Sequence, residues 1–288
     1  MSSNTEQDDV TGIETTGHEW DGIKELNNPL PRWWLWTFYA TIVFAIGYTV
    51  AYPAWPLVSS STSGLLNWSS RGNLANDIQS VADSRAALAL DLTQVELTEV
   101  SDKPELMQFA LAGGASAFRV NCSQCHGSGA AGGGIYPNLV DDDWLWGGSL
   151  DDIYITLLHG IRYAQDDDSR ISDMPAFGDL LSRDEVNAVA AYVANLSAPS
   201  ANATADTTGQ TIFMDNCSVC HGEAGEGMIE LGAPALNDAI WLYDGDVEQI
   251  AAQIRNPKMG VMPGWQGRLD DVTIRQLTLY VHSLGGGQ

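Results

Sequence analysis

A five-residue motif that occurs twice constrains this chain more than any other feature. Each copy has two cysteines separated by two residues and followed at once by a histidine: Cys122, Cys125 and His126 in the first copy, and Cys217, Cys220 and His221 in the second. The pattern C-x-x-C-H is typical of covalent c-type haem attachment. The thiols form thioether bonds to the porphyrin, and the next residue presents its imidazole to the iron. The sequence therefore predicts two covalently bound haem c groups.

Cysteine pairs can also bind zinc or form a redox-active disulfide. A zinc ribbon brings its two pairs to within roughly 15–20 residues of each other, whereas a stretch as long as a small domain separates Cys125 from Cys217. Each pair also has its own histidine, and no cysteine is left over for a structural disulfide. We therefore favour haem attachment over a zinc site or a redox pair.

A methionine followed by proline lies well downstream of each motif, at Met174 and at Met262. A thioether sulfur is a soft ligand, and histidine–methionine ligation raises the potential of haem iron and leaves no coordination site open. We expect Met174 and Met262 to be axial ligands opposite His126 and His221, so that each haem carries electrons rather than activates oxygen. Met259 is a rival to Met262.

The other residues considered for these sites have alternative roles. His159 has no counterpart in the second copy, and we expect it at a helix end rather than on iron. A carbonyl in the loop of Pro137, or of Pro234, could accept the Nδ1–H of the proximal histidine and fix its tautomer. Trp144 and Trp241 are expected to cover a haem edge, to reach a propionate or to pack in the core.

The two motifs belong to a duplicated unit. Gly114, Phe118 and Asn121 precede the first motif at the same spacings at which Gly209, Phe213 and Asn216 precede the second, and a Tyr-Val pair closes each copy. The fold class that follows is mainly α, with one N-terminal transmembrane helix and two tandem cytochrome c domains. The expected divisions are a segment 1–32, a span 33–53, a linking helical segment 54–112, a first domain 113–197, a linker 198–208 and a second domain 209–288.

The expected span is a run without charge. No charged residue occurs from Trp33 to Ser70, and about 20 helical residues cross the roughly 30 Å core of a bilayer. Aromatic side chains gather at both ends of the run, as in the belts of membrane interfaces. The acidic, polar residues before it are unlike the short basic start of a cleaved signal peptide. Lipid is therefore an expected partner.

Two observations orient the span. Lys24 and Arg32 precede it and the next basic residue is Arg71, which fits the positive-inside rule. Haem is joined to C-x-x-C-H on the outer side of the bacterial inner membrane. We therefore expect an inner-membrane protein with one span, a cytoplasmic N-terminus and periplasmic haem domains.

Helix starts can be placed from capping residues. Asn76 or Asp77 would cap a helix through Leu90, and Asp102 one that begins near Pro104. In the haem domains, helices are expected after Ser149, after Ser182 (a capping box with Glu185) and after Asp270 or Asp271. Helices this short are not stable alone in water, so the haem must supply much of each core.

The net charge of −24, from 13 basic and 37 acidic residues, limits the partners. Nucleic acid is excluded as a partner, because binding phosphates needs clustered lysine and arginine. An acidic surface could steer a basic electron donor, or it could simply keep the protein soluble. Charge alone does not separate these two interpretations.

Two segments resemble a known family. The stretch 21–34, DGIKELNNPLPRWW, resembles the segment that leads into the anchor helix of the dihaem subunit (CcoP/FixP, subunit III) of cbb3-type cytochrome c oxidases. The stretch 160–178, with GIRY, DDD and MPAFG, is similar to the first haem domain of that subunit. The resemblance implies that the chain accepts electrons from a periplasmic cytochrome c and passes them to a monohaem subunit and a haem–copper subunit, which reduces oxygen to water and pumps protons.

The resemblance also bears on the axial ligands. It implies that Met262 serves the His126 haem and Met174 the His221 haem, whereas spacing alone suggests pairing within each domain. The chain itself would be a relay without a catalytic site. The alternatives are a free-standing, membrane-tethered dihaem carrier similar to cytochrome c4, a dihaem peroxidase and a gas sensor. The last two require an open coordination site, which the Met-Pro pairs argue against.

Overall fold

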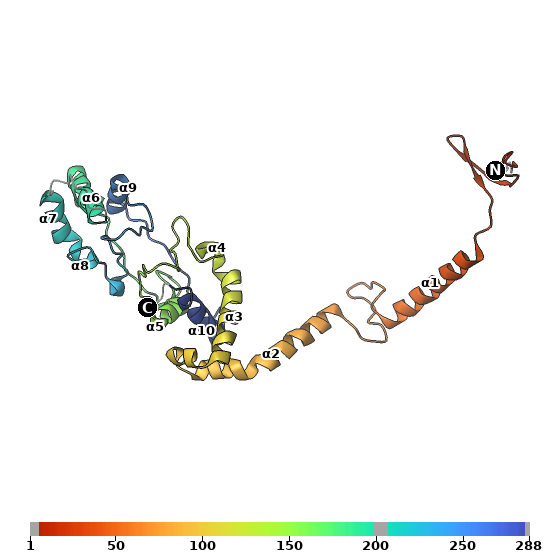
Figure 1. The fold of residues 1–288 in the computed structure, drawn as a ribbon, viewed down its shortest axis with the longest axis horizontal. Coiled ribbons are helices and arrows are strands. Elements are labelled where there is room, and N and C mark those ends of the chain that lie inside the picture. Colours follow the sequence, from red (N-terminus) through yellow and green to blue (C-terminus); the bar gives the residue numbers. More distant parts are fainter. Residues whose placement is uncertain (1–5, 198–206, 286–288) are drawn as a thin grey trace. The chain divides into compact units, whose positions relative to one another are not determined.

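The computed structural model describes residues 6–197 and 207–285, which form two compact units, Met1–Ser84 and Arg85–Gln288 (Figure 1). The predicted linker 198–208 lies almost wholly outside the described residues. The expectation of a mainly helical chain with one candidate membrane span is confirmed. Each unit is described by itself below.

The first unit begins with a small hairpin that we did not predict. Strands β1 (Thr15–Trp20) and β2 (Ile23–Leu26) are antiparallel, and Trp20 pairs with Ile23 across a two-residue turn. The turn residues Asp21 and Gly22 have φ angles of 49° and 87°. Two consecutive positive φ angles match the twist of a hairpin, and the Asp-Gly sequence is a recognised signal for such a turn.

Helix α1 (Arg32–Ala51) is the candidate membrane span. It begins after Pro31, whose fixed φ angle suits a helix start, and it ends before Pro53, close to the predicted span 33–53. None of its residues is buried in protein, as expected of a helix that is apolar all round and faces lipid. The next segment is hydrogen-bonded to its C-terminal end, since Leu65 N donates to Val50 O (2.9 Å) and Leu66 N to Ala51 O (3.1 Å).

Helix α2 (Ser70–Gln94) runs from the first unit into the second. The predicted cap at Asn76 or Asp77 is wrong, because the helix starts about two turns earlier, where Ser69 Oγ accepts from Gly72 N (2.9 Å). Two elements follow, the 3-10 turn η1 (Leu97–Asp102) and helix α3 (Pro104–Asn121). The start of α3 near Pro104 agrees with the prediction, but the predicted cap at Asp102 is wrong, because the N-cap is Lys103 and makes no side-chain hydrogen bond.

Short elements make up the rest of the second unit. In chain order they are α4 (Ser123–His126), α5 (Leu150–His159), η2 (Phe177–Asp179), α6 (Arg183–Ser197), α7 (Thr207–Asn216), α8 (Ser218–His221), η3 (Ile229–Leu231), α9 (Val247–Arg255) and α10 (Asp271–His282). Three predicted caps are confirmed. Ser149 Oγ accepts from Asp152 N (3.1 Å), Asp270 caps Thr273 N (2.7 Å), and Ser182 N donates to Glu185 (2.8 Å).

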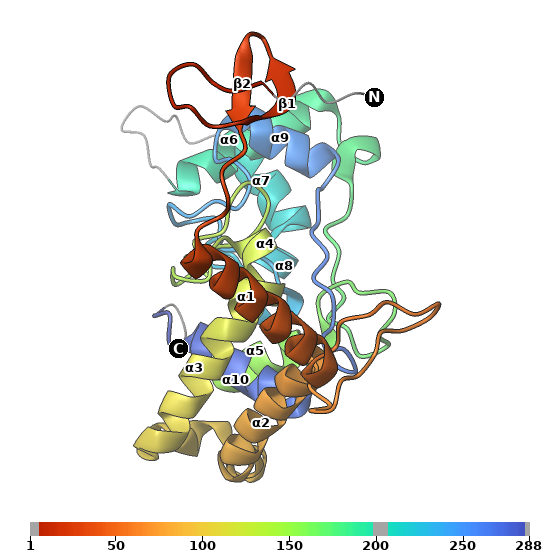
Figure 2. The same cartoon turned by 90° about the vertical axis from the view of Figure 1, so that its right-hand side faces the viewer.

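Two of the hydrophobic cores combine helices from both sequence repeats. In the first core, α3 and α5 of the first repeat pack against α10 of the second, with Phe118, Leu157 and Leu277 at its centre. In the second core, α7 and α9 of the second repeat pack against α6 of the first, with Val189 and Phe213 buried. Figures 1 and 2 show the second group, α6, α7 and α9, gathered apart from α3, α5 and α10.

The glycine and aromatic residues that match between the repeats form these contacts. A side chain at Gly114 would collide with α10 at Gln276 and Tyr280, and one at Gly209 would collide with α6 at Ala188. The ring of Phe118 lies 5.6 Å from Tyr280, and the equivalent ring of Phe213 lies 5.4 Å from Tyr192. Because both repeats carry the same contact residues, α6 and α10 can change places, as identical elements do in domain swapping.

The chain crosses between the cores in two segments that lie side by side. Ile161 N donates to Met262 O (2.9 Å), and Met262 N donates to Ile161 O (3.0 Å), which forms an antiparallel bridge. The predicted domains 113–197 and 209–288 follow the repeat in the sequence, and they remain a sequence-based division. The packed cores do not follow this division, because each combines helices from both repeats.

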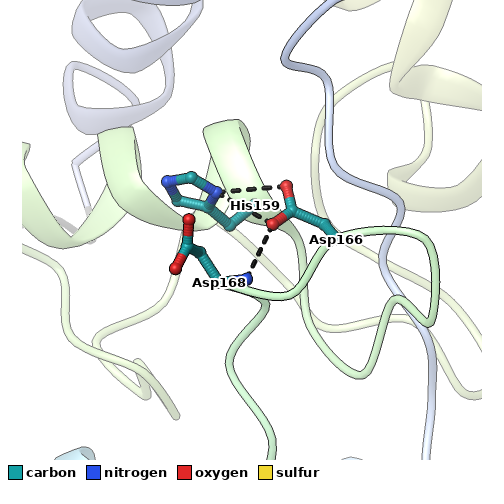
Figure 3. A group of neighbouring side chains, drawn as sticks. All are labelled: His159, Asp166 and Asp168. Atoms are coloured by element: carbon teal, nitrogen blue, oxygen red, sulfur yellow. Dashed lines mark hydrogen bonds and ion pairs between the residues drawn. The ribbon is translucent and has the colours of Figure 1, made fainter.

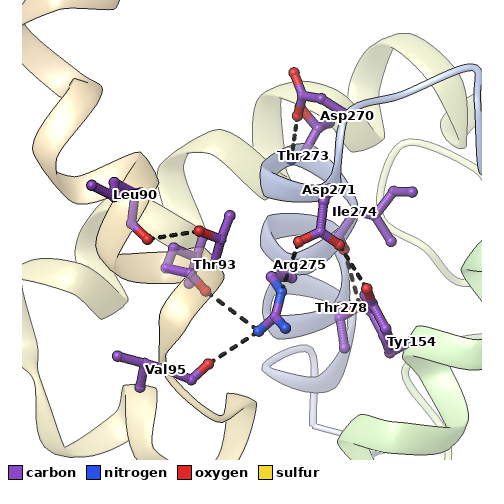
Figure 4. A network of polar contacts seen from close by, with 11 residues as sticks. Leu90, Thr93, Val95, Tyr154, Asp270, Asp271, Thr273, Ile274, Arg275 and Thr278 are labelled. Atoms are coloured by element: carbon purple, nitrogen blue, oxygen red, sulfur yellow. Dashed lines mark hydrogen bonds and ion pairs between the residues drawn. The ribbon is translucent and has the colours of Figure 1, made fainter.

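A third core joins the end of α2 and η1 to α3 and α10, and Arg275 holds it at one edge (Figure 4). Arg275 Nη1 donates to the carbonyls of Leu92 (3.3 Å) and Val95 (3.0 Å), and its Nε donates to Asp271 (3.1 Å). Tyr154 Oη donates to the other oxygen of Asp271 (2.6 Å). This network satisfies carbonyls at the end of α2 that the helix itself leaves unpaired.

Candidate haem sites

The two C-x-x-C-H motifs adopt the same tight turn. Cys122 O accepts from the backbone N–H of Cys125 (3.1 Å) and of His126 (3.0 Å), and Cys217 O accepts from Cys220 (3.1 Å) and His221 (3.0 Å). The longer helices α3 and α7 end at the first cysteine, so each motif forms one further turn, α4 or α8. One turn brings the two sulfurs and the imidazole of each motif to the same side.

The proximal histidines are oriented as predicted. His126 Nδ1 lies 3.1 Å from Pro137 O, and His221 Nδ1 lies 3.0 Å from Pro234 O. A carbonyl only accepts hydrogen bonds, so Nδ1 carries the proton and Nε2 keeps a free lone pair for a metal. Burial lowers the pKa of both imidazoles, which favours the neutral form that binds iron.

The first cysteine of each motif lies in an apolar environment. Burial raises the pKa of the Cys122 thiol to about 11, and burial raises the pKa of Cys217 to about 11 as well. A zinc ligand or a reactive redox cysteine needs the opposite, a stabilised thiolate. A neutral thioether is compatible with burial, so these environments favour haem attachment.

One cavity of about 610 Å³ joins both motifs. Roughly 300–1,000 Å³ is usual for sites that enclose an organic ligand. All eight predicted site residues line it: Cys122, Cys125, His126, Met174, Cys217, Cys220, His221 and Met262. Met259, the rival to Met262, lines it too.

The two methionines pack against different cores, and each core holds the motif of the other repeat. Met262 packs against the core that contains Cys122, and Met174 packs against the core that contains Phe213 and is contacted by Cys217. The bridge between Ile161 and Met262 fixes the backbone of one methionine. The packing therefore favours ligation across the repeats over ligation within them.

One unsatisfied buried donor suits a ligand with carboxylates. Trp144 Nε1 and Arg162 Nε are buried and, within the described residues, have no hydrogen-bond acceptor. Arg162 lies in the cavity wall with a φ angle of 50°, and its Nε is 3.4 Å from Asp173 Oδ1 without the alignment of a hydrogen bond. Unsatisfied buried donors are costly in proteins, so Arg162 fits one of the propionates that every haem carries. Trp144 packs against the first core instead.

His159 is at the C-terminal end of α5, as predicted for a histidine that does not bind iron. Its Nδ1 lies 3.1 Å from Asp166 Oδ2, and Asp168 is the third member of the cluster (Figure 3). Asp168 N also donates to Asp166 Oδ1 (2.9 Å). This cluster closes the loop that follows α5, next to the bridge that holds Met262.

Comparisons with known proteins agree with the geometry. The family model described as cytochrome c oxidase, cbb3-type, subunit III matches residues 109–193 and 204–281. The model of the N-terminal domain of cytochrome oxidase-cbb3, FixP, matches residues 12–59. The chain belongs to the cbb3-type cytochrome c oxidase subunit III family. The name FixP appears both in the matched N-terminal domain and in the curated relatives. The predicted resemblance to the dihaem subunit of cbb3-type oxidases is therefore confirmed.

The relatives match over nearly their full length. The cbb3-type cytochrome c oxidase subunit FixP of Azorhizobium caulinodans is 53% identical over 282 residues, which cover 98% of this chain and 96% of the relative. FixP of Sinorhizobium medicae is 51% identical over 284 residues (98% and 97%). The subunit CcoP of Cereibacter sphaeroides is 50% identical over 276 residues (95% and 95%).

Family membership decides between the functions that the sequence left open. The chain is a cytochrome c electron-transfer subunit of the cbb3 type with two covalent haem c groups, rather than a free-standing carrier. The tight turns, the oriented imidazoles and the unsatisfied donor of Arg162 all fit that cofactor.

Proposed function

We propose that this chain takes electrons from a periplasmic cytochrome c and relays them to the membrane-anchored monohaem subunit and the haem–copper subunit of its oxidase. The observation that carries this proposal is the single cavity shared by both C-x-x-C-H motifs. A relay needs two redox centres at a short, fixed separation, and a common cavity meets that need. The proposal places the N-terminus in the cytoplasm and the repeats 113–197 and 209–288 in the periplasm.

The proposal assigns each chain residue a task. Cys122 and Cys125, like Cys217 and Cys220, hold a porphyrin by thioether bonds. His126 and His221 present Nε2 to the iron, because the Pro137 and Pro234 carbonyls retain the proton on Nδ1. Bound haem supplies the one-electron chemistry, since its iron cycles between the ferric and ferrous states.

The distal ligands in this proposal are exchanged between the repeats. Met262 would pair with His126 and Met174 with His221. The packing of each methionine on the opposite core supports this pairing over the one within each repeat. With one histidine and one methionine holding each iron, no coordination site would be open, and the chain itself would act as a relay rather than react with oxygen.

A native gel of detergent-solubilised membranes tests the proposal. The gel is stained for haem and for cytochrome c oxidase activity, and its bands are probed for b-type haem. We expect this chain in a large band that has activity and b-type haem. Migration alone at a small size, under detergent conditions that keep the catalytic subunit active, would contradict the proposal and favour a tethered carrier.

A further inference from the structure

The two haem-binding turns can be compared residue by residue, since their backbone hydrogen bonds are equivalent. Gly132 N donates to His126 O (2.9 Å) and Gly227 N to His221 O (2.8 Å). Leu139 N donates to Ala130 O, and Leu236 N to Gly225 O. Residues 122–132 therefore correspond to 217–227, which includes the six positions after each motif. The same backbone carries two different surfaces, and each copy serves as a control for the other.

The exposed positions of the second turn have become apolar or acidic. In each pair the first residue belongs to the first copy and the second to its counterpart: Arg119 and Met214, Val120 and Asp215, Gln124 and Val219, Ser128 and Glu223, Ala131 and Glu226. All ten side chains are exposed. Four of these five exchanges make the second turn more negative, by removing a base or by adding an acid, and the fifth, Gln124 to Val219, makes it more apolar.

The apolar part of the second surface lies at the place where electrons would leave or arrive. Val219 stands between the two cysteines that attach the porphyrin, and it is 72% exposed. Met214 is 39% exposed, and Ile229 is 42% exposed. Thioether bonds are made at the porphyrin edge, so Val219, between the two cysteines, would lie beside that edge.

The difference in charge between the two turns extends into the sequence on either side of each turn. Arg119 is the only Asp, Glu, Lys or Arg between Glu105 and Asp141, so the first turn is nearly neutral. No lysine or arginine occurs between Arg183 and Arg255, where acidic residues recur throughout. The second turn is thus an exposed apolar spot within a stretch of sequence that carries acids and no lysine or arginine.

We propose that the second turn is the docking surface for a basic cytochrome c donor, and we call it the donor rim (Met214, Asp215, Val219, Glu223, Glu226 and Ile229). The inference rests on the proposed function, which it deepens by naming the haem that electrons reach first. Electron-transfer encounters are small and short-lived, with a few apolar contacts at the centre. Acidic side chains around the centre speed the approach of a basic partner and orient it. The nearly neutral first turn offers no such attraction.

The test uses two double variants of the full chain in the purified oxidase. Asp215→Asn with Glu223→Gln removes two negative charges from the donor rim. Val120→Lys with Ser128→Lys adds two positive charges at the equivalent positions of the first turn, so the net charge of the protein changes equally in both. Stopped-flow mixing measures the second-order rate of electron transfer from a reduced, positively charged monohaem cytochrome c at low and high salt. A small uncharged phenylenediamine serves as a second reductant.

We expect the donor-rim variant to react about three- to tenfold more slowly than the wild type at low salt, with a weaker dependence on salt. The first-turn variant should stay within about twofold of the wild type. Equal losses in both variants would overturn the proposal, since only net charge would then matter. Unchanged rates in both would overturn it as well.

The second reductant separates this proposal from the proposed function. If the phenylenediamine drives oxygen consumption by the purified wild-type complex while the donor-rim variant reacts normally with cytochrome c, only the docking surface is wrong. If the chain does not copurify with oxygen-consuming activity, the proposed function is wrong.

Discussion

Truncation of one buried leucine in α10 tests whether the cores are exchanged between the repeats. Leu277 is fully buried in the first core, where it packs with Phe118, Ile153 and Leu157 of the first repeat. Leu277→Ala removes three side-chain carbons and leaves a cavity, which costs about 3 kcal/mol at a fully buried site. If the structure is right, the variant destabilises α3 and α5 of the first repeat rather than α7 and α9, which belong to the same repeat as Leu277.

Hydrogen exchange of the holoprotein, followed by mass spectrometry, locates the loss. About 3 kcal/mol corresponds to roughly a hundredfold faster exchange wherever exchange needs the affected core to open. We expect this acceleration in peptides from α3, α5 and α10. Peptides from α7 and α9 should exchange as in the wild type.

The matched variant is Val189→Ala in α6, at the position equivalent to Leu277. Val189 is also fully buried, and its truncation should cost about 2 kcal/mol. Here the acceleration is expected in α7 and α9, although α6 belongs to the first repeat. If Leu277→Ala accelerated α7 and α9 while α3 and α5 were unchanged, the exchanged cores would be refuted.

Three further predictions follow from the sites and the network around them. Met262→His should lower the midpoint potential of one haem and slow turnover at unchanged haem content, because imidazole favours ferric iron; unchanged midpoints in a potentiometric titration would contradict the ligand assignment. Burial and the nearby Asp238 raise the pKa of Asp143 from 3.8 to about 6, so the native state binds more protons than the unfolded state in that range and the free energy of unfolding falls as pH rises through it. Asp143→Asn should remove this slope and add about 1 kcal/mol at pH 7, after allowance for solvent screening, as measured by denaturant midpoints between about pH 4 and pH 8. Arg275→Met should cost about 2 kcal/mol by leaving the carbonyls of Leu92 and Val95 unpaired (Figure 4), which should appear as faster hydrogen exchange at the end of α2.

Features with local causes could be predicted from the sequence. The C-x-x-C-H turns and the hydrogen bonds from His126 and His221 to the proline loops depend on neighbouring residues, and the structure has them as expected. The caps at Ser149 and Ser182 are local too. The span ends within two residues of its predicted limit, because Pro53 stands two residues after its last helical residue.

Two local features were missed for different reasons. The β1–β2 hairpin could have been found from Asp21-Gly22, but its strands are too short and polar to show a clear alternation. Helix α2 has three possible capping residues, at Ser69, Asn76 and Asp77. Sequence alone does not rank them, since each can accept from a backbone N–H two or three residues further on.

The exchange of α6 and α10 could not be predicted from residue patterns. Gly114 fits against Tyr280 as Gly209 fits against Tyr192, and the opposite pairing would use the same residue types. A duplicated sequence therefore allows two packings with nearly equal contact chemistry. The connections decide between them, because the segments around Ile161 and Met262 hydrogen-bond to each other only when both cross over.

The exchange has a consequence for electron transfer between the haems. If each repeat folded on itself, the two sites could move apart, with only a linker between them. In the observed packing each core contains the methionine segment of the opposite repeat, so separating the cores would pull both methionines out of the shared cavity. Trp146 adds a direct contact, since its buried side chain lines the shared cavity and lies against Gly232 of the second repeat, and its carbonyl accepts a hydrogen bond from Arg170. A separation fixed in this way keeps the tunnelling distance constant, which a relay requires and which two independent domains on a linker would not provide.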